Sequence, residues 1–317
     1  MSILKYFGFT FIICMLITAC QKDVIEADVK SIETHAGMPI EDMLFINDSV
    51  GYAVGGKAYN NGIILSTSDG GETWITDTII RHGLWAISKN ENNEVNATGF
   101  SGNLLIKNPG QHWYHYRLPI YNEMTGTLCD REGGVFLCSG MSFQAGKIIH
   151  LRTDYSIDTI FETTNEIRSL AYAGEHSLVA VGYGAVFNSD DNGKSWHRSK
   201  LDGDYFRKVV FTDPGTGYIA GFSGTLYKTT DGGKNWSQLL SSGHLLKGSD
   251  SFLGMAFKDS NEGYICGQYG LLMKTNDGGK NWKHYKRFTE DHLNSITFAR
   301  NAVLVCSSSG KIYNIHP

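Results

Sequence analysis

One phrase, [ST]-x-D-x-G-x-x-W, occurs four times in this chain and sets an internal period. Its copies end at Trp74, Trp196, Trp236 and Trp282, and a degenerate fifth copy ends at Trp113. Neighbouring tryptophans lie 39, 40 or 46 residues apart, and the 83 residues from Trp113 to Trp196 fit two periods with one tryptophan missing. A period of roughly 40–50 residues is typical of a four-stranded propeller blade. The period therefore predicts an all-β repeat fold.

Each repeat contains short apolar runs separated by Gly- and Asp-rich turns, as in residues 209–236. Such runs indicate the strands of a meander, and no long stretch has the 3.6-residue apolar period of a helix. Seven repeats can be counted, but the last ends after three strands. Residues 29–34 precede the first repeat and can supply the missing fourth strand of the last one, which would leave no open edge. We predict a seven-bladed β-propeller of four-stranded antiparallel blades over residues 29–317, with the last blade closed by an N-terminal strand.

The repeated phrase, an Asp box, has a structural interpretation. An Asp that follows Ser or Thr accepts backbone N–H groups in a turn, and Gly supplies positive φ. The Trp buries a large apolar body between neighbouring sheets. Because the phrase recurs once per blade, we assign a folding role to its members, Asp69, Trp74, Asp191, Trp196, Asp231, Trp236, Asp277 and Trp282.

The N-terminus has the pattern of an export signal. Lys5 precedes an apolar run from Tyr6 to Ile17, which is too short for a comfortable membrane span. The run ends in Ile17-Thr-Ala-Cys20, which resembles the lipobox of bacterial lipoproteins. We predict a signal peptide over residues 1–19, a lipidated Cys20, a tether through residue 28, and a lipid-anchored protein of the bacterial cell envelope, periplasmic or surface-facing. The alternative is an ordinary secretory signal.

The charge of the chain narrows the classes of partner that it could bind. The formal net charge of −4 argues against nucleic acid as a partner, which would require a basic stripe.

The cysteines are expected to be mainly structural. Cys138, Cys266 and Cys306 occupy matching second-strand positions, as small core residues do. Cys129 could face Cys138 across one hairpin, so a disulfide between them stays open. His112 and His115 would point to opposite faces of a strand, and we expect neither a metal nor a cofactor.

The segment from Gly263 to Trp282, and its copies ending at Trp236 and Trp74, carry a family resemblance. The chain resembles the photosystem II stability/assembly factor-like propellers, within the wider class of BNR/Asp-box proteins. The resemblance covers about residues 30 to 317. It implies a non-enzymatic propeller that binds a protein or peptide partner at a membrane.

Sialidases also carry Asp boxes, so a glycoside hydrolase is the competing enzymatic interpretation. They share an Arg-Ile-Pro motif, and the nearest match here is Tyr116-Arg-Leu-Pro119. We expect this match on an outer strand, far from the ring axis where catalytic groups would converge. We therefore predict no enzymatic activity.

Two sets of positions are candidates for partner binding. The turns between second and third strands carry an aromatic residue in six blades, namely Tyr59, Phe100, Phe143, Tyr183, Phe222 and Tyr269. The starts of the inner strands give a second ring, Glu41, Gly83, Thr125, Arg168, Arg207, Leu253 and Asn294, with His82, Tyr205 and His292 nearby.

Arg168 and Arg207 occupy matching places on adjacent blades and could grip a carboxylate through bidentate bonds. The hypothesis is that this mouth binds an acidic or C-terminal peptide. Three alternatives stay open: surface pairing of the two arginines with Glu166 and Asp204, carbohydrate stacking on exposed aromatic rings, and a purely architectural envelope module.

Overall fold

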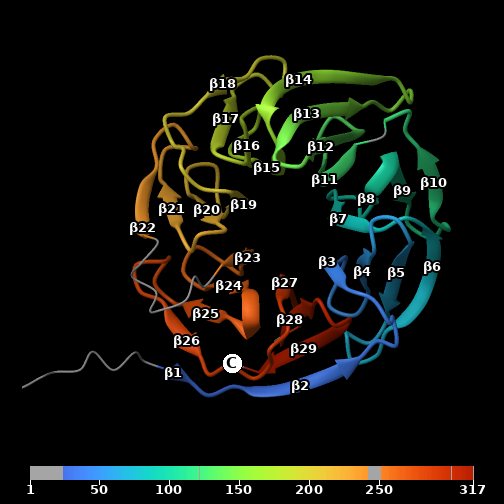
Figure 1. Cartoon of the computed structure of the whole chain (residues 1–317), viewed down its shortest axis with the longest axis vertical. Helices are drawn as coiled ribbons and strands as arrows, with labels where there is room; N and C mark the ends of the chain where they lie inside the picture. The colour runs from blue at the N-terminus through green and yellow to red at the C-terminus, as the bar shows by residue number, and fades with distance from the viewer. Residues whose placement is uncertain (1–23, 121, 242–250, 301, 317) are drawn as a thin grey trace, which may run out of the picture.

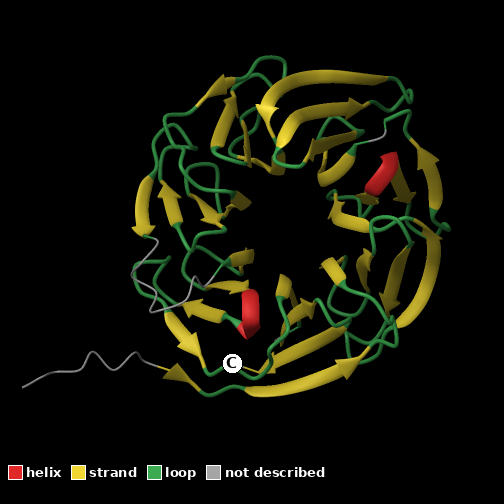
Figure 2. Cartoon of the chain, viewed as in Figure 1, coloured by secondary structure: helices red, strands yellow, loops and turns green. Residues whose placement is uncertain are grey.

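The computed structural model describes residues 24–120, 122–241, 251–300 and 302–316. Seven sheets, antiparallel except for one short pairing at the edge of one of them, form a ring in which each sheet is a blade, and the two short 3-10 helices are the only helices in the described part (Figures 1 and 2). The predicted fold class, an all-β seven-bladed propeller, is confirmed. No helix of the described residues is long and apolar enough to cross a membrane.

The strands follow one another from the inside of each blade outward. Blade one contains β3 (Ile40–Phe45), β4 (Gly51–Gly56), β5 (Asn61–Thr67) and β6 (Ile75–Arg81). Blade two contains β7 (Leu84–Lys89), β8 (Val95–Gly99), β9 (Asn103–Lys107) and β10 (Tyr114–Arg117), with η1 (Phe100–Gly102) between β8 and β9. Blade three contains β11 (Glu123–Cys129), β12 (Val135–Met141), β13 (Gln144–Leu151) and β14 (Ile157–Asn165). Blade four contains β15 (Ile167–Tyr172), β16 (Leu178–Gly182), β17 (Ala185–Ser189) and β18 (His197–Arg198).

The remaining blades follow the same order. Blade five contains β19 (Phe206–Phe211), β20 (Gly217–Gly221), β21 (Leu226–Thr229) and β22 (Ser237–Leu240). Blade six contains β23 (Phe252–Phe257), β24 (Gly263–Gly267), β25 (Leu272–Thr275) and β26 (Lys283–Tyr285), with η2 (Gln268–Gly270) between β24 and β25. Blade seven contains β27 (Leu293–Ala299), β28 (Ala302–Ser307), β29 (Lys311–His316) and the N-terminal β2 (Asp28–Glu33).

The N-terminal segment closes the ring. Strand β2 pairs antiparallel with β29, from Asp28 opposite His316 to Glu33 opposite Lys311, one residue earlier than expected. A further strand, β1 (Val24–Ile25), pairs in parallel with β26 and makes blade six five-stranded (Figure 1). Part of the segment expected to be a tether therefore lies on the rim of the propeller. Cys20 lies outside the described residues.

The core is divided among the contacts between neighbouring blades. Trp74 illustrates this, because it meets Phe45 of its own blade edge to face at 5.9 Å and shares a buried cluster with Leu304 of blade seven. Trp196, Trp236 and Trp282 likewise belong to clusters that include the preceding blade. The predicted placement of these tryptophans between sheets is confirmed.

The Asp box forms the turn that leads to the outermost strand. In each of the four boxes the Ser or Thr hydroxyl donates to the Asp carboxylate at 2.8–2.9 Å and accepts the N–H of the Gly four residues on. Three of the Trp rings donate to that Gly's carbonyl at 3.0–3.1 Å. Trp236 does not, and the Gly233 carbonyl accepts the Asn188 amide. The structural interpretation of the boxes agrees with this geometry.

Two cysteines that were candidates for a disulfide do not face each other. In the register of β11 and β12, Cys129 lies opposite Val135, while Cys138 lies opposite Gly126. All four cysteines of the described residues are buried free thiols, and burial raises the pKa of Cys138 to about 12. The sequence left a disulfide between Cys129 and Cys138 open, and in the structure both residues are free thiols.

Candidate functional site

The inner strand of every blade carries a β-bulge near its start. The pairing of β3 with β4 skips Glu41, and each of the other six inner strands skips one residue at the matching place. A bulge leaves one residue unpaired and re-aims its side chain. The seven skipped residues all line one central cavity of about 240 Å³, and they are Glu41, Trp85, Thr125, Arg168, Arg207, Leu253 and Asn294.

This ring differs from the sequence prediction in blade two, where Gly83 was expected and Trp85 is found. Gly83 precedes β7, and a Cβ atom there would lie 2.7 Å from the Trp85 ring. The glycine thus gives the indole room to lie across the chain. The indole nitrogen of Trp85 is buried and has no hydrogen-bond partner among the described residues.

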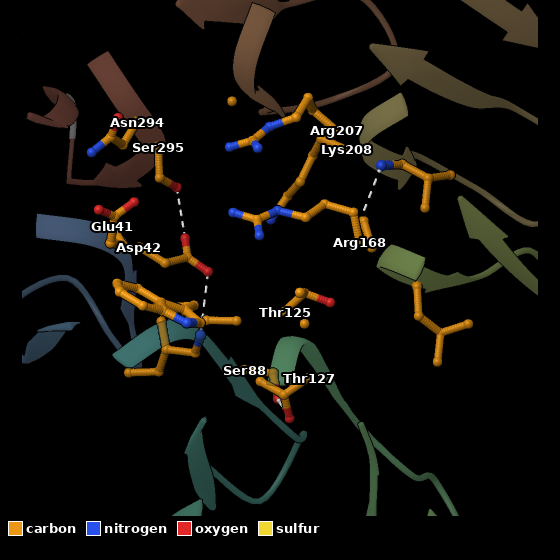
Figure 3. A pocket seen from close by; sticks show the side chains of 18 of the residues that line it. Glu41, Asp42, Ser88, Thr125, Thr127, Arg168, Arg207, Lys208, Asn294 and Ser295 are labelled. Atoms are coloured by element: carbon orange, nitrogen blue, oxygen red, sulfur yellow. Dashed lines mark hydrogen bonds between the residues drawn. The ribbon is translucent and has the colours of Figure 1, made fainter. Parts of the chain in front are cut away.

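Arg168 and Arg207 extend side by side into the cavity (Figure 3). No carboxylate of the described residues lies within 4.0 Å of either guanidinium group. Burial, and after it the charge of Arg168, lowers the pKa of Arg207 to about 10, which leaves it protonated at neutral pH. Its Nε is buried without a described partner, and its guanidinium lies 5.4 Å from the centre of the Tyr205 ring. The pair concentrates two positive charges in one place without a carboxylate at salt-bridge distance.

The carboxylates suggested as partners of these arginines are used elsewhere. Glu166 accepts the backbone N–H of Phe143 at 2.9 Å and the hydroxyl of Tyr205 at 2.6 Å. Asp204 accepts the N–H groups of Tyr205 and Ser223 and the hydroxyl of Thr225. Both carboxylates are buried. The alternative in which the arginines form ordinary surface pairs with Glu166 and Asp204 is not what the structure has, because these carboxylates hold the aromatic turns in place.

An aromatic groove adjoins the arginine pair. A depression of about 910 Å³ spans blades three to five and shares Arg168 and Arg207 with the central cavity. Phe143, Tyr183, Tyr205 and Phe222 line it in one chain of contacts, with ring centres 4.9, 5.8 and 6.3 Å apart. Phe143 and Tyr183 are 50% and 46% exposed. Tyr205, which holds both Arg207 and Glu166, links the groove to the arginines.

The other predicted aromatic residues do not join this groove. Tyr59 and Phe100 contact each other at 4.7 Å, and His82 lies beside Phe100 at 5.7 Å. Tyr269 meets His292 at 4.9 Å, and its backbone N–H donates to the imidazole. The six aromatic turns therefore form three separate groups, not one continuous rim.

Three polar residues of the cavity serve the contacts between blades. Asp42 accepts the Ser295 hydroxyl at 2.7 Å and the backbone N–H of Ile87 at 3.2 Å. Asn294 donates its amide to the Ile40 carbonyl at 2.9 Å. Thr125 donates its hydroxyl to the Ile167 carbonyl of blade four. The predicted ring thus mixes ligand-accessible groups with groups that tie one blade to the next.

The residues considered for enzymatic or metal chemistry do not line the central cavity. Arg117, in the motif that was compared with sialidases, is on the outermost strand β10 and donates to the Ser101 hydroxyl at 2.7 Å. His115 contacts the Asn103 amide oxygen at 2.9 Å. Within the described ranges, no cluster of three or more His, Cys, Asp or Glu residues could hold a metal ion.

Comparisons with known proteins agree with this fold. The chain is similar to a structure of YCF48 bound to D1 peptide, with a TM-score of 0.71 and 20% identity over 93% of this chain and 98% of that one. It is similar to YCF48 from Cyanidioschyzon merolae, with a TM-score of 0.66 and 16% identity over 91% and 98%. It is also similar to virginiamycin B lyase from Staphylococcus aureus, with a TM-score of 0.70 and 9% identity over 92% and 100%. At these identities the likeness shows a shared fold.

A search of curated proteins found no match to the chain. A family model described as photosynthesis system II assembly factor YCF48 matches residues 202–314, which form blades five to seven. Over those blades the chain matches the photosystem II assembly factor family, and the resemblance predicted from its repeated phrase is confirmed.

Proposed function

We propose that the protein is a non-enzymatic binding or assembly factor whose loop face holds a peptide segment of a protein partner. The observation that carries this proposal is the arginine pair. Arg168 and Arg207 have no described acidic partner, one of them has a buried unpaired Nε, and both open onto an aromatic groove. Guanidinium groups in such a place bind carboxylates through paired hydrogen bonds. A peptide carboxylate would enter between the arginines while its neighbours pack against the rings.

The likeness to a propeller seen with a bound peptide supports a peptide as the ligand. The ring geometry supports it as well. The exposed rings of Phe143 and Tyr183 are tilted by 35° to each other, and Tyr205 stands at 87° to Phe143 and at 64° to Tyr183, so the rings do not form one coplanar platform on which a sugar would stack. Aromatic edges and faces at mixed angles suit the apolar side chains of a peptide.

Binding of short fluorescent peptides that contain Asp or Glu, measured by polarisation, tests the proposal. The variant Arg168→Ala/Arg207→Ala should lose affinity for them by at least tenfold, because each guanidinium contributes a charge-assisted bond of about 1.5–3 kcal/mol. Arg81→Ala is the matched control, since Arg81 is exposed at the end of β6 and lies outside the groove. Equal affinities of the double variant and the wild type would exclude the arginine pair as the binding site.

We further propose that Cys20 is lipidated and anchors the protein in the cell envelope. The support is the small-residue signal sequence before Cys20. Stable anchoring needs more than one acyl chain, which modification of an N-terminal cysteine supplies. Metabolic labelling with an alkyne fatty acid should mark the wild type but not Cys20→Ala. Equal labelling of both would reject the lipid anchor and leave the peptide proposal untouched.

A further inference from the structure

Glu41 faces the arginine pair from the opposite side of the cavity. It is the bulged residue of β3 in blade one, and its carboxylate points toward the space in front of Arg168 and Arg207 (Figure 3). Nevertheless, no Lys, Arg or His nitrogen of the described residues comes within 4.0 Å of it. Burial raises the pKa of Glu41, and the two arginines oppose that rise. The glutamate and the two arginines thus share one cavity without forming a salt bridge.

Glu123 is a second carboxylate near the arginines, and it lies in the aromatic groove. It begins β11 in blade three and lines the aromatic groove together with Arg168. It is half-buried, and among the residues that the structure describes it forms neither a salt bridge nor a side-chain hydrogen bond. Burial raises its pKa too, while Arg168 lowers it and the charge of Glu166 adds to the rise. A pair of arginines is thus flanked by two carboxylates that lack close partners.

The backbone explains why these groups stay apart. Glu41, Arg168 and Arg207 project from bulges on three different blades, whose positions are fixed by the sheets and by the packing between them. A half-buried carboxylate without a partner is costly, and a ligand cation that reached it would remove that cost. A ligand carrying only negative charge would instead meet two repulsive groups on its way to the arginines, which is a means of rejecting wrong partners.

We propose that Glu41 and Glu123 are specificity-determining residues, which select a peptide whose carboxylate is accompanied by a basic side chain, Lys or Arg, two residues away. In an extended peptide, side chains two residues apart lie about 6.6 Å from each other on the same face. A carboxylate between the arginines can therefore place a neighbouring ammonium or guanidinium group beside a flanking glutamate. This inference rests on the proposed function, because it concerns the same mouth.

Three synthetic peptides with a common central Asp test the inference. They carry Lys, Gln or Glu two residues to either side of that Asp. The wild type should bind the Lys peptide about three- to tenfold more tightly than the Gln peptide, and the Glu peptide most weakly, since each partly exposed ion pair contributes little alone. Glu41→Gln/Glu123→Gln should bind the Lys and Gln peptides equally. Glu175→Gln, an exposed glutamate outside the groove, should keep the wild-type order.

The outcomes separate this inference from the proposed function. If the arginine variant loses all three peptides while the glutamate variant keeps the wild-type order, the flanking glutamates do not select the ligand, and only this inference fails. If the arginine variant binds all three peptides as the wild type does, the proposed function fails. A circular dichroism spectrum and an unfolding midpoint equal to those of the wild type would show that each variant is folded.

Discussion

The hydroxyl of the Asp box should hold its turn, and Thr229→Val tests this in blade five. Thr229 is 1% exposed, and its Oγ accepts the N–H of Gly233 at 3.0 Å and donates to Asp231 at 2.8 Å. Valine keeps the shape and removes these two bonds, together with the one that the Asp231 N–H donates to the same oxygen at 3.2 Å. The buried Gly233 N–H loses its acceptor, at a cost of about 1–3 kcal/mol, and a bond to an ionised group is lost as well. We expect a total destabilisation of about 3 kcal/mol.

Urea unfolding followed by tryptophan fluorescence measures this loss as a lower midpoint at an unchanged slope. Thr229→Ser is the matched control, because the box of blade four already uses Ser189 with the same bonds at 2.8 and 2.9 Å. We expect the serine variant within about 1 kcal/mol of the wild type, since it loses one methyl group. A valine variant as stable as the serine variant would refute the structural account of the box.

Three further predictions concern stability and thiol chemistry. Hydrogen bonds hold the pKa of Asp231 at about 2, below the unfolded value of about 3.9. The ionised Asp231 therefore stabilises the folded chain at neutral pH, and this contribution disappears as the pH falls from about 4 to 2. Urea midpoints measured across that pH range would show the loss. Ile32→Asp should lower the free energy of unfolding by about 3 kcal/mol or more in the same assay, because Ile32 is buried where β2 closes the ring. Ser31→Asp is the control, and it should lower the free energy of unfolding little because Ser31 lies on the exposed face of β2. When the chain is denatured without a reductant and then alkylated, mass spectrometry should find both Cys129 and Cys138 alkylated, since both are free thiols. A disulfide-linked peptide containing both would contradict the register of β11 and β12.

Much of the fold could be predicted from local pattern. The spacing of the boxes indicated seven blades even though one box is lost, because each blade needs about 40 residues for its four strands whether or not it keeps the box. Closure by the N-terminal segment followed from counting strands, and the structure places it in β2. The additional strand β1 could not be foreseen, since a two-residue parallel pair leaves no period in the sequence.

The candidate site was only partly accessible to the same reasoning. Matching positions on neighbouring blades identified Arg168 and Arg207, but in blade two the same reasoning gave Gly83, because the register of β7 was not fixed by pattern. A bulge shifts which residue faces the cavity, and it depends on the pairing of two strands, which one strand's sequence does not specify.

The sequence alone determined the repeat, the blade and the role of the box, because these depend on bonds and packing within about forty residues. Only the tertiary structure decided that Glu166 and Asp204 hold turns and that the arginines keep their charge unpaired. It also decided that Phe143, Tyr183, Tyr205 and Phe222 form one groove while Tyr59 and Tyr269 lie elsewhere. Glu166 and the rings of Phe143 and Tyr183 find their partners on neighbouring blades, and those distances are set when the ring closes.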